Sequence, residues 1–200
     1  MEKKEIYKKI LFEIIDWIKI FVFAILIVVI IRGFVIEPVI VNGISMEDTL
    51  FNGQKLLIYK LGYFFHPPKR GDIVVLRYQS LPSTSNSISG KWGSLSRAFP
   101  AVAEIDYIKR VIGLPGDKID IIEGYVYVNG EKLEEVYVKG KTYKDVMDFP
   151  VVVPENTVFV MGDNREYSKD SRTIGFVEFN RIRGKAILRI WPLKDLGIIK

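Results

Sequence analysis

An apolar run near the N-terminus is the feature that most constrains how this chain of 200 residues can fold. Residues 14–31 are apolar except for Asp16 and Lys19, and residues 20–31 carry no charge. A helix that spans a bilayer needs about 20 mostly apolar residues, and this run reaches that length if the basic side chains at its ends extend to the interfaces. The sequence therefore predicts one transmembrane anchor over residues 14–34.

A cleaved signal peptide and a buried core helix are the alternatives for this run. A signal peptide should be followed by small residues at a cleavage site, but the bulky sequence Gly-Phe-Val-Ile-Glu-Pro follows Arg32. A core helix usually has a polar face, and residues 21–31 have none. An uncleaved anchor is the interpretation that fits both observations.

The charges before the run predict the orientation of the chain. Four lysines precede the apolar residues, at positions 3, 4, 8 and 9. Basic residues near a membrane helix favour the cytoplasmic side. We therefore expect residues 1–13 in the cytoplasm and residues 35–200 outside it, in a cell-membrane protein that crosses the bilayer once.

Short runs of β-branched and aromatic residues, separated by Gly, Pro and Asn, dominate the chain beyond residue 35. This pattern predicts a mainly β protein with antiparallel sheets. The candidate strands are Val35–Val41, Lys55–Tyr59, Asp72–Arg77, Ile105–Ile112, Lys118–Ile122, Tyr125–Val128, Thr157–Met161 and Lys185–Ile190.

Two segments depart from this regular pattern. Asn129-Gly130 between two strand-like runs is a strong signal for a tight hairpin, and residues 118–154 are expected to form a small inserted β lobe. Residues 79–104 are rich in serine and lack apolar periodicity, so we expect an exposed loop there.

Composition excludes several classes of function. The net charge is +5, but basic residues are scattered among acidic ones, so no nucleic-acid partner is expected. There are no cysteines, which excludes disulfides, thiolate zinc sites and a cysteine nucleophile. The acidic residues 163–170 lack the spacing of a calcium loop, and we predict neither a metal nor a cofactor.

Ser45 and Lys109 are the candidate catalytic residues. Serine needs an adjacent base, and the chain has one histidine, His66, in a turn-like stretch beside two prolines, which makes a Ser-His-Asp triad improbable. Lysine can serve as the base if burial keeps it neutral. Lys109 lies in an apolar strand, on the same face as Tyr107 and Val111, which fits that need.

Four stretches together resemble the type I signal peptidases, the membrane-bound Ser-Lys peptidases that remove signal peptides from exported proteins. The stretches begin at Gly43 (Gly-Ile-Ser-Met-Glu-Asp-Thr-Leu), Arg70 (Arg-Gly-Asp-Ile-Val-Val), Tyr107 (Tyr-Ile-Lys-Arg-Val-Ile-Gly-Leu-Pro-Gly-Asp) and Met161 (Met-Gly-Asp-Asn-Arg-Glu-Tyr-Ser-Lys-Asp-Ser-Arg-Thr-Ile-Gly). They occur in this order behind a single membrane segment, and the resemblance extends to Ile190-Trp-Pro-Leu193.

The resemblance implies a role for each residue of the site. Ser45 would attack the scissile carbonyl, Lys109 would take its proton, and Ser168 would hydrogen-bond to the lysine and orient it. The partners implied are signal peptides of exported preproteins and the lipid bilayer. Supporting residues would be Asp163 and Asn164, which brace the site, and Asp170, Arg172 and Arg110, with Arg110 expected to join Asp170.

Signal peptides are cut after small residues, and an added strand would bring alternate side chains into pockets. By family position the pockets would be lined by Val39, Val41, Met46, Leu50, Tyr107 and Ile108, although these are also typical core residues. Two positions depart from the family pattern. Gly43 leaves the second oxyanion donor unassigned, and Asp48 stands where the family has proline.

Two other functions remain open from the sequence. A self-cleaving Ser-Lys peptidase, of the kind fused to DNA-binding repressors, shares the nucleophile and base, but the anchor argues against it. A catalytically inactive membrane β scaffold is favoured only by Gly43 and Asp48.

Overall fold

The computed structural model describes residues 2–78 and 105–199. This part of the chain begins with a long helix. Helix α1 runs over Glu2–Ile30 and continues as a single π-helical turn, η1, over Ile31–Val35. The helix and the strands belong to two different compact units of the chain.

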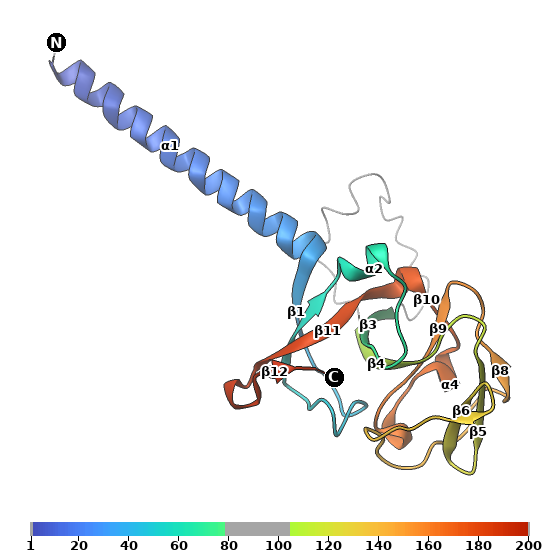
Figure 1. The fold of residues 1–200 in the computed structure, drawn as a ribbon. Helices are drawn as coiled ribbons and strands as arrows, with labels where there is room; N and C mark the ends of the chain where they lie inside the picture. Colours follow the sequence, from blue (N-terminus) through green and yellow to red (C-terminus); the bar gives the residue numbers. More distant parts are fainter. Residues whose placement is uncertain (1, 79–104, 200) are drawn as a thin grey trace. The chain divides into compact units, whose positions relative to one another are not determined.

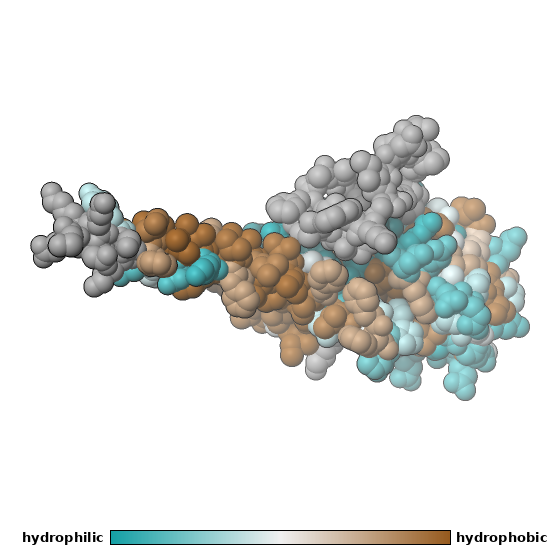
Figure 2. All heavy atoms as spheres, turned by 90° about the horizontal axis from the view of Figure 1, so that it is seen from above, coloured by the Kyte–Doolittle hydropathy of each residue, from teal (hydrophilic) through white to brown (hydrophobic). Residues whose placement is uncertain are grey.

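The helical residues Ile10–Val35 are long and apolar enough, by length and composition, to cross a membrane. The predicted anchor over residues 14–34 lies within this range. Figure 2 shows apolar side chains over most of the visible length of α1. Asp16 and Lys19, the two charges in the first half of the predicted span, form an ion pair of 3.0 Å along the helix, which lowers the cost of carrying both charges in an apolar segment.

The second unit is built from antiparallel strands, as the sequence predicts. Its larger sheet has the order β1-β2-β11-β3-β4-β9-β10, with β12 paired to β11 (Figure 1). The strands are β1 (Ile36–Ile40), β2 (Lys55–Tyr59), β3 (Ile73–Tyr78), β4 (Ile105–Gly113), β9 (Thr157–Met161), β10 (Val177–Glu178), β11 (Ile182–Trp191) and β12 (Gly197–Ile198).

A smaller sheet is inserted between β4 and β9, at the place predicted for the small lobe. Its order is β7-β6-β5-β8. The expected hairpin at Asn129-Gly130 joins β6 to β7, and both residues have positive φ, 56° and 88°. The predicted loop over residues 79–104 lies outside the described residues. The strands are β5 (Lys118–Ile122), β6 (Tyr125–Val128), β7 (Glu131–Lys132) and β8 (Val151–Val152).

Short helical turns complete this unit. They are α2 (Gly62–Phe65), η2 (Arg165–Tyr167), α4 (Ser171–Ile174), η3 (Phe179–Arg181) and η4 (Leu193–Asp195). Two of them, η2 and α4, lie in the stretch of the sequence that begins at Met161, immediately after β9.

Alternation along the strands divides the core between the two faces of the larger sheet. In β3, Ile73 and Val75 join one cluster, while Val74 and Leu76 join another. In β4, Ile108 packs in the first of these clusters and Val111 in the second. This two-residue period is what a strand with both faces covered requires.

The smaller sheet does not have a core of its own. Ile119 of β5 and Val126 of β6 pack in one cluster with Phe159 and Met161 of β9. Because β9 leads directly into the segment that begins at Gly162, packing against the inserted sheet also places that segment.

Strand bounds agree closely with the predicted ones, and β11 is the main exception. It starts at Ile182, three residues before the predicted strand, because the chain passes Gly184 without leaving the sheet. A Cβ at Gly184 would lie 2.8 Å from the carbonyl oxygen of Tyr59 in β2. Glycine is therefore needed there for close approach of two backbones and does not end the strand.

Candidate active site

Ser45 lies in a turn that follows β1 and is held by buried side chains that come after it in the chain. Met46 and Leu50 are 2% and 0% exposed and belong to the core beneath β2 and β3. The Leu50 amide donates to the Met46 carbonyl over 2.8 Å, which closes one helical turn. Ser45 itself is half-buried.

A distant segment holds the backbone of this turn. The Asn164 amide donates to the carbonyl of Ser45 over 3.1 Å, and its side chain donates to the carbonyl of Ile44, also over 3.1 Å. Asn164 thus fixes the two residues at the start of the turn, in agreement with its predicted bracing position.

The side chain of Lys109 reaches this serine from β4. Its Nζ lies 2.7 Å from Ser45 Oγ and 3.0 Å from the carbonyl oxygen of Ile108. Lys109 is 2% exposed. Burial lowers the pKa of Lys109 from 10.5 to about 8, although the carboxylates of Asp170 and Asp163 act in the opposite direction. The predicted pairing of a serine with a buried lysine is therefore present in the structure.

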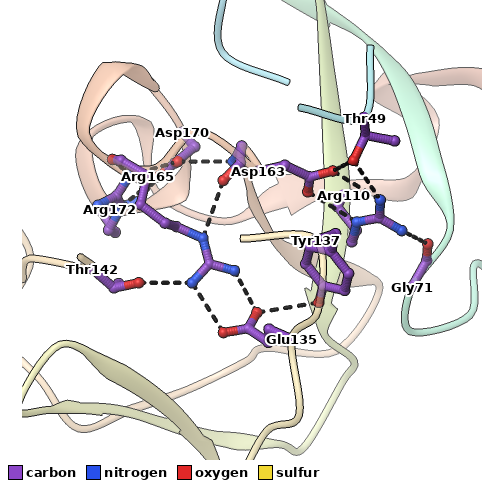
Figure 3. Close-up of polar contacts among 11 residues, drawn as sticks. Thr49, Gly71, Arg110, Glu135, Tyr137, Thr142, Asp163, Arg165, Asp170 and Arg172 are labelled. Atoms are coloured by element: carbon purple, nitrogen blue, oxygen red, sulfur yellow. Dashed lines mark hydrogen bonds and ion pairs between the residues drawn. The ribbon is translucent and has the colours of Figure 1, made fainter. Parts of the chain in front are cut away.

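Arg110, the next residue of β4, points away from the lysine and pairs with Asp163. Its Nε and Nη2 donate to the two carboxylate oxygens over 2.9 and 2.8 Å, and Nη1 donates to the carbonyl of Gly71 over 3.0 Å. Asp163 also accepts a bond of 2.6 Å from the hydroxyl of Thr49 in the serine turn (Figure 3).

The expectation that Arg110 joins Asp170 is wrong. Pairing of β4 with β9 sets Arg110 opposite Met161, so the carboxylate that follows closely in the chain, Asp163, is the one within reach. Asp170 is bound instead by Arg172, whose Nε and Nη2 each donate over 2.8 Å.

Asp170 and Arg172 form a buried local support after β9. Asp170 is the N-cap of α4 and accepts bonds from the backbone amides of Arg172 and Gly162. Arg172 donates to the carbonyl of Arg165 over 2.7 Å. These bonds tie the two ends of the segment 162–172 together, as a charged support would.

Ser168 does not make the predicted hydrogen bond to Lys109. Its hydroxyl is buried and has no partner among the described residues. It lies close to Gly162 and to the backbone of Ser45, because a Cβ at Gly162 would be 2.2 Å from Ser168 Oγ and 2.4 Å from the Ser45 carbonyl oxygen. Only glycine fits at position 162.

The six predicted pocket residues fall into two groups. Five lie in or against one core cluster, and Tyr107 packs with the cluster on the other face of the sheet. Leu50 is fully buried, so it can support a pocket only from behind. The five are Val39, Val41, Met46, Leu50 and Ile108.

Sequence reasoning missed a second layer of buried charges. Arg165, in η2, is 1% exposed and donates to both carboxylate oxygens of Glu135 and, over 2.7 Å, to the hydroxyl of Thr142. Tyr137 lies against Arg110, with the guanidinium carbon 3.9 Å from the ring centroid. Glu135 and Tyr137 lie outside the four recognised stretches and carry no motif, whereas Arg165 lies within the stretch that begins at Met161 and could have been predicted.

No group of three or more His, Cys, Asp and Glu side chains among the described residues is arranged to hold a metal ion. The chemistry that the site offers comes from a hydroxyl, an amine and backbone amides.

Comparisons with known proteins agree with these features. A family model described as "Signal peptidase, peptidase S26" matches residues 14–191. Signal peptidase I of Bacillus licheniformis is 33% identical over 204 residues, which cover 98% of this chain and 96% of that protein. Signal peptidase I P of Bacillus subtilis subsp. natto is 37% identical over 191 residues, or 90% of this chain and 91% of that protein. A solved signal peptidase I from Enterococcus faecalis is 28% identical, covers 60% of this chain and 97% of that one, and has a TM-score of 0.41.

Proposed function

This chain belongs to the signal peptidase family, peptidase S26, and we propose that it is a membrane-anchored serine endopeptidase that removes signal peptides from exported preproteins. The observation that carries the mechanism is the separation of 2.7 Å between Lys109 Nζ and Ser45 Oγ in a buried setting. No metal or cofactor is needed for the steps below.

The uncharged amine of Lys109 acts as the general base. It accepts the hydroxyl proton as Ser45 Oγ attacks the scissile carbonyl, and it then returns the proton to the leaving amine. The acyl-enzyme is hydrolysed by a water that the same lysine activates. A lowered pKa of about 8 supports this role, because a useful fraction of the lysine is then neutral near physiological pH.

Ser168 is the proposed orienting residue. Its buried hydroxyl has no competing partner among the described residues, so it is available to accept an N–H of Lys109 once the amine is protonated. Asp163, Asn164, Asp170, Arg172 and Arg110 are proposed to support the site through the bonds described above.

The backbone amide of Ser45 is the proposed oxyanion donor. Within the described part of the chain it donates to no acceptor, and it belongs to the nucleophile itself. Preorganised donors of this kind are usually a large part of the catalytic effect. Gly43 carries no hydroxyl, and its own amide is already bound to Asn52 over 3.0 Å, so a second donor stays unassigned.

The substrate is proposed to bind as an added strand beside β4. Residues Ile105–Arg110 pair with β3 on one side, whereas β9 pairs only with residues from Arg110 onward. Among the described residues, no strand pairs with Ile108 and Lys109 on their other side, next to the catalytic amine. The predicted pocket residues, with Val39 and Ile108 foremost, would admit alanine-sized side chains there.

The anchor and orientation are also proposals. Residues 14–34 would span the bilayer, with residues 1–13 in the cytoplasm and the catalytic unit, residues 35–200, outside. The absence of cysteine makes a direct test available. A cysteine introduced at Lys194 should react with a membrane-impermeant thiol reagent in intact cells, and one at Lys4 should react only after lysis.

Cleavage of a preprotein with an Ala-x-Ala site tests the proposed activity. We expect wild type to cut it in detergent and Ser45→Ala and Lys109→Ala to be inactive. Lys118→Ala removes an exposed lysine of β5 and should cleave like wild type.

Other outcomes would identify a rival function. Equal cleavage by Ser45→Ala would remove the assignment of the nucleophile. Self-cleavage without preprotein cleavage would indicate the self-cleaving class, and a folded wild type without either activity would favour the inactive scaffold.

A further inference from the structure

A stretch of the inserted sheet region returns to the active site and contacts the buried arginines there. It runs from Glu135 to Thr142, beyond β7. The Lys139 amide donates to the carbonyl of Asp163 over 2.8 Å, and the Arg165 amide donates to the carbonyl of Lys139 over 3.0 Å. This stretch therefore lies alongside the segment that carries Asp163.

The guanidinium of Arg110 lies over the ring of Tyr137, with the guanidinium carbon 3.9 Å from the ring centroid (Figure 3). Arg110 already uses its edges to bind Asp163 and Gly71. A guanidinium held at its edges can still tilt out of its plane, and an aromatic ring stacked on its face opposes that motion.

Glu135 fixes the position of this ring. The hydroxyl of Tyr137 donates to Glu135 over 3.1 Å, and the same carboxylate is held by Arg165. Burial and the neighbouring carboxylate both raise the pKa of Tyr137, so its hydroxyl stays protonated and continues to donate. The side chain of Glu135 is 8% exposed and that of Arg165 is 1% exposed, so water competes little for these bonds.

The contacts form a continuous path from this ring to the serine turn. Arg110 binds both oxygens of Asp163, and Asp163 accepts from the hydroxyl of Thr49, four residues after Ser45. Lys109 is the neighbour of Arg110 in β4. A shift of the Arg110 guanidinium would therefore move the turn that carries the nucleophile relative to the strand that carries the base.

We propose that Tyr137 is a positioning residue, whose ring, held by Glu135, fixes Arg110 and through Asp163 and Thr49 keeps Ser45 opposite Lys109. This inference rests on the proposed proteolysis, because its main readout is the rate of cleavage. Tyr137 acts through other residues and has no contact with the reacting atoms.

Two substitutions of Tyr137 separate the ring from the hydroxyl. Tyr137→Leu removes the stacked ring, and we expect kcat to fall about ten-fold, with KM within about two-fold of wild type, since a loss of roughly 1.4 kcal/mol in positioning is ten-fold in rate. Tyr137→Phe keeps the ring but loses the bond to Glu135, so kcat should fall only about three-fold. The acid limb of the pH profile should move to higher pH in Tyr137→Leu, because a loosened gap admits water to Lys109.

Two controls distinguish positioning from a general loss of stability. Tyr125→Leu removes an exposed tyrosine of the same inserted sheet, which contacts Lys132, and should leave kcat unchanged. Val128→Ala opens a cavity in the core under that sheet without touching Arg110. If Val128→Ala lowers kcat as much as Tyr137→Leu at an equal loss of Tm, the proposal is overturned.

The remaining outcomes are also decisive. If wild type does not cleave the preprotein, the proposed function is refuted. If wild type and Tyr137→Leu cleave it with equal kcat, only the positioning role of Tyr137 is refuted. If Tyr137→Leu does not fold, Tyr137→Phe takes its place, because it keeps the ring and removes only the bond from its hydroxyl to Glu135. It should lower kcat about three-fold with little change in KM, and an unchanged kcat would overturn the proposal.

Discussion

Replacing Lys109 with methionine should abolish cleavage and at the same time stabilise the fold near neutral pH. The folded state holds the pKa of Lys109 at about 8, against 10.5 in the unfolded chain. Between these two values the unfolded state binds more protons, so this residue makes the free energy of unfolding rise with pH. Near pH 7 the difference of about 2.5 pKa units corresponds to about 3 kcal/mol of destabilisation, which disappears above about pH 10.5.

The measurement is urea unfolding of the full chain in detergent, for wild type and Lys109→Met, at several pH values from about 7 to 10. The free energy of unfolding is plotted against pH for each protein. Loss of the amine's hydrogen bonds offsets the variant's curve by an amount that hardly depends on pH. Titration of the lysine, in contrast, makes the separation of the two curves change with pH. Across this range we expect the free energy of unfolding of wild type to rise by roughly 2 to 3 kcal/mol relative to that of the variant.

A matched substitution controls for the loss of one positive charge. Lys118→Met removes an exposed lysine of β5, in the smaller sheet. If the wild-type and Lys109→Met curves run parallel from pH 7 to 10, the amine is not desolvated, and the reasoning that makes it a base is wrong.

Three further outcomes test other parts of the site. The acid limb of kcat/KM should report an apparent pKa near 8, the value to which burial lowers Lys109, and a limb near 10.5 would contradict the buried amine. Gly162→Ala should lower activity by about 100-fold, because its Cβ would lie 2.4 Å from the nucleophile's carbonyl oxygen, whereas Gly197→Ala, with no atom closer than 3.9 Å, should be active. Asp163→Asn should lower the free energy of unfolding by about 3 to 5 kcal/mol, because it leaves Arg110 buried without a counter-ion. Thermal unfolding would measure this loss, and a loss below about 1 kcal/mol would contradict the prediction.

Much of the fold could be predicted because its signals are local. Alternating β-branched residues define strands such as β5 and β6 with the bounds that the structure has, and Asn129-Gly130 specifies the hairpin between β6 and β7. A local sequence pattern does not predict a strand boundary that is set by a tertiary contact. Gly184 breaks the apolar pattern of β11 but stays in the strand, because the backbone of β2 packs against it.

The catalytic residues could be predicted because few residue types in this chain can serve as the general base for a serine. A chain with one histidine and no cysteine leaves a lysine as the available base, and the apolar neighbours of Lys109 indicate which one. The choice of ion-pair partner was not predictable in this way. Arg110 binds Asp163 and not Asp170 because of the register between β4 and β9, and register is a property of the assembled sheet. The role of Tyr137 depends on the same kind of long-range contact.

The bonds from Asn164 to the serine turn also matter for the order in which the protein is made. A nascent chain that ends before residue 163 already contains the hydroxyl and the amine, but it has neither Asn164 to hold the backbone of Ser45 nor Asp163 to hold Thr49. The turn that carries Ser45 can therefore be held in place only once synthesis has passed residue 164, well after the apolar helical residues 10–35 have been made.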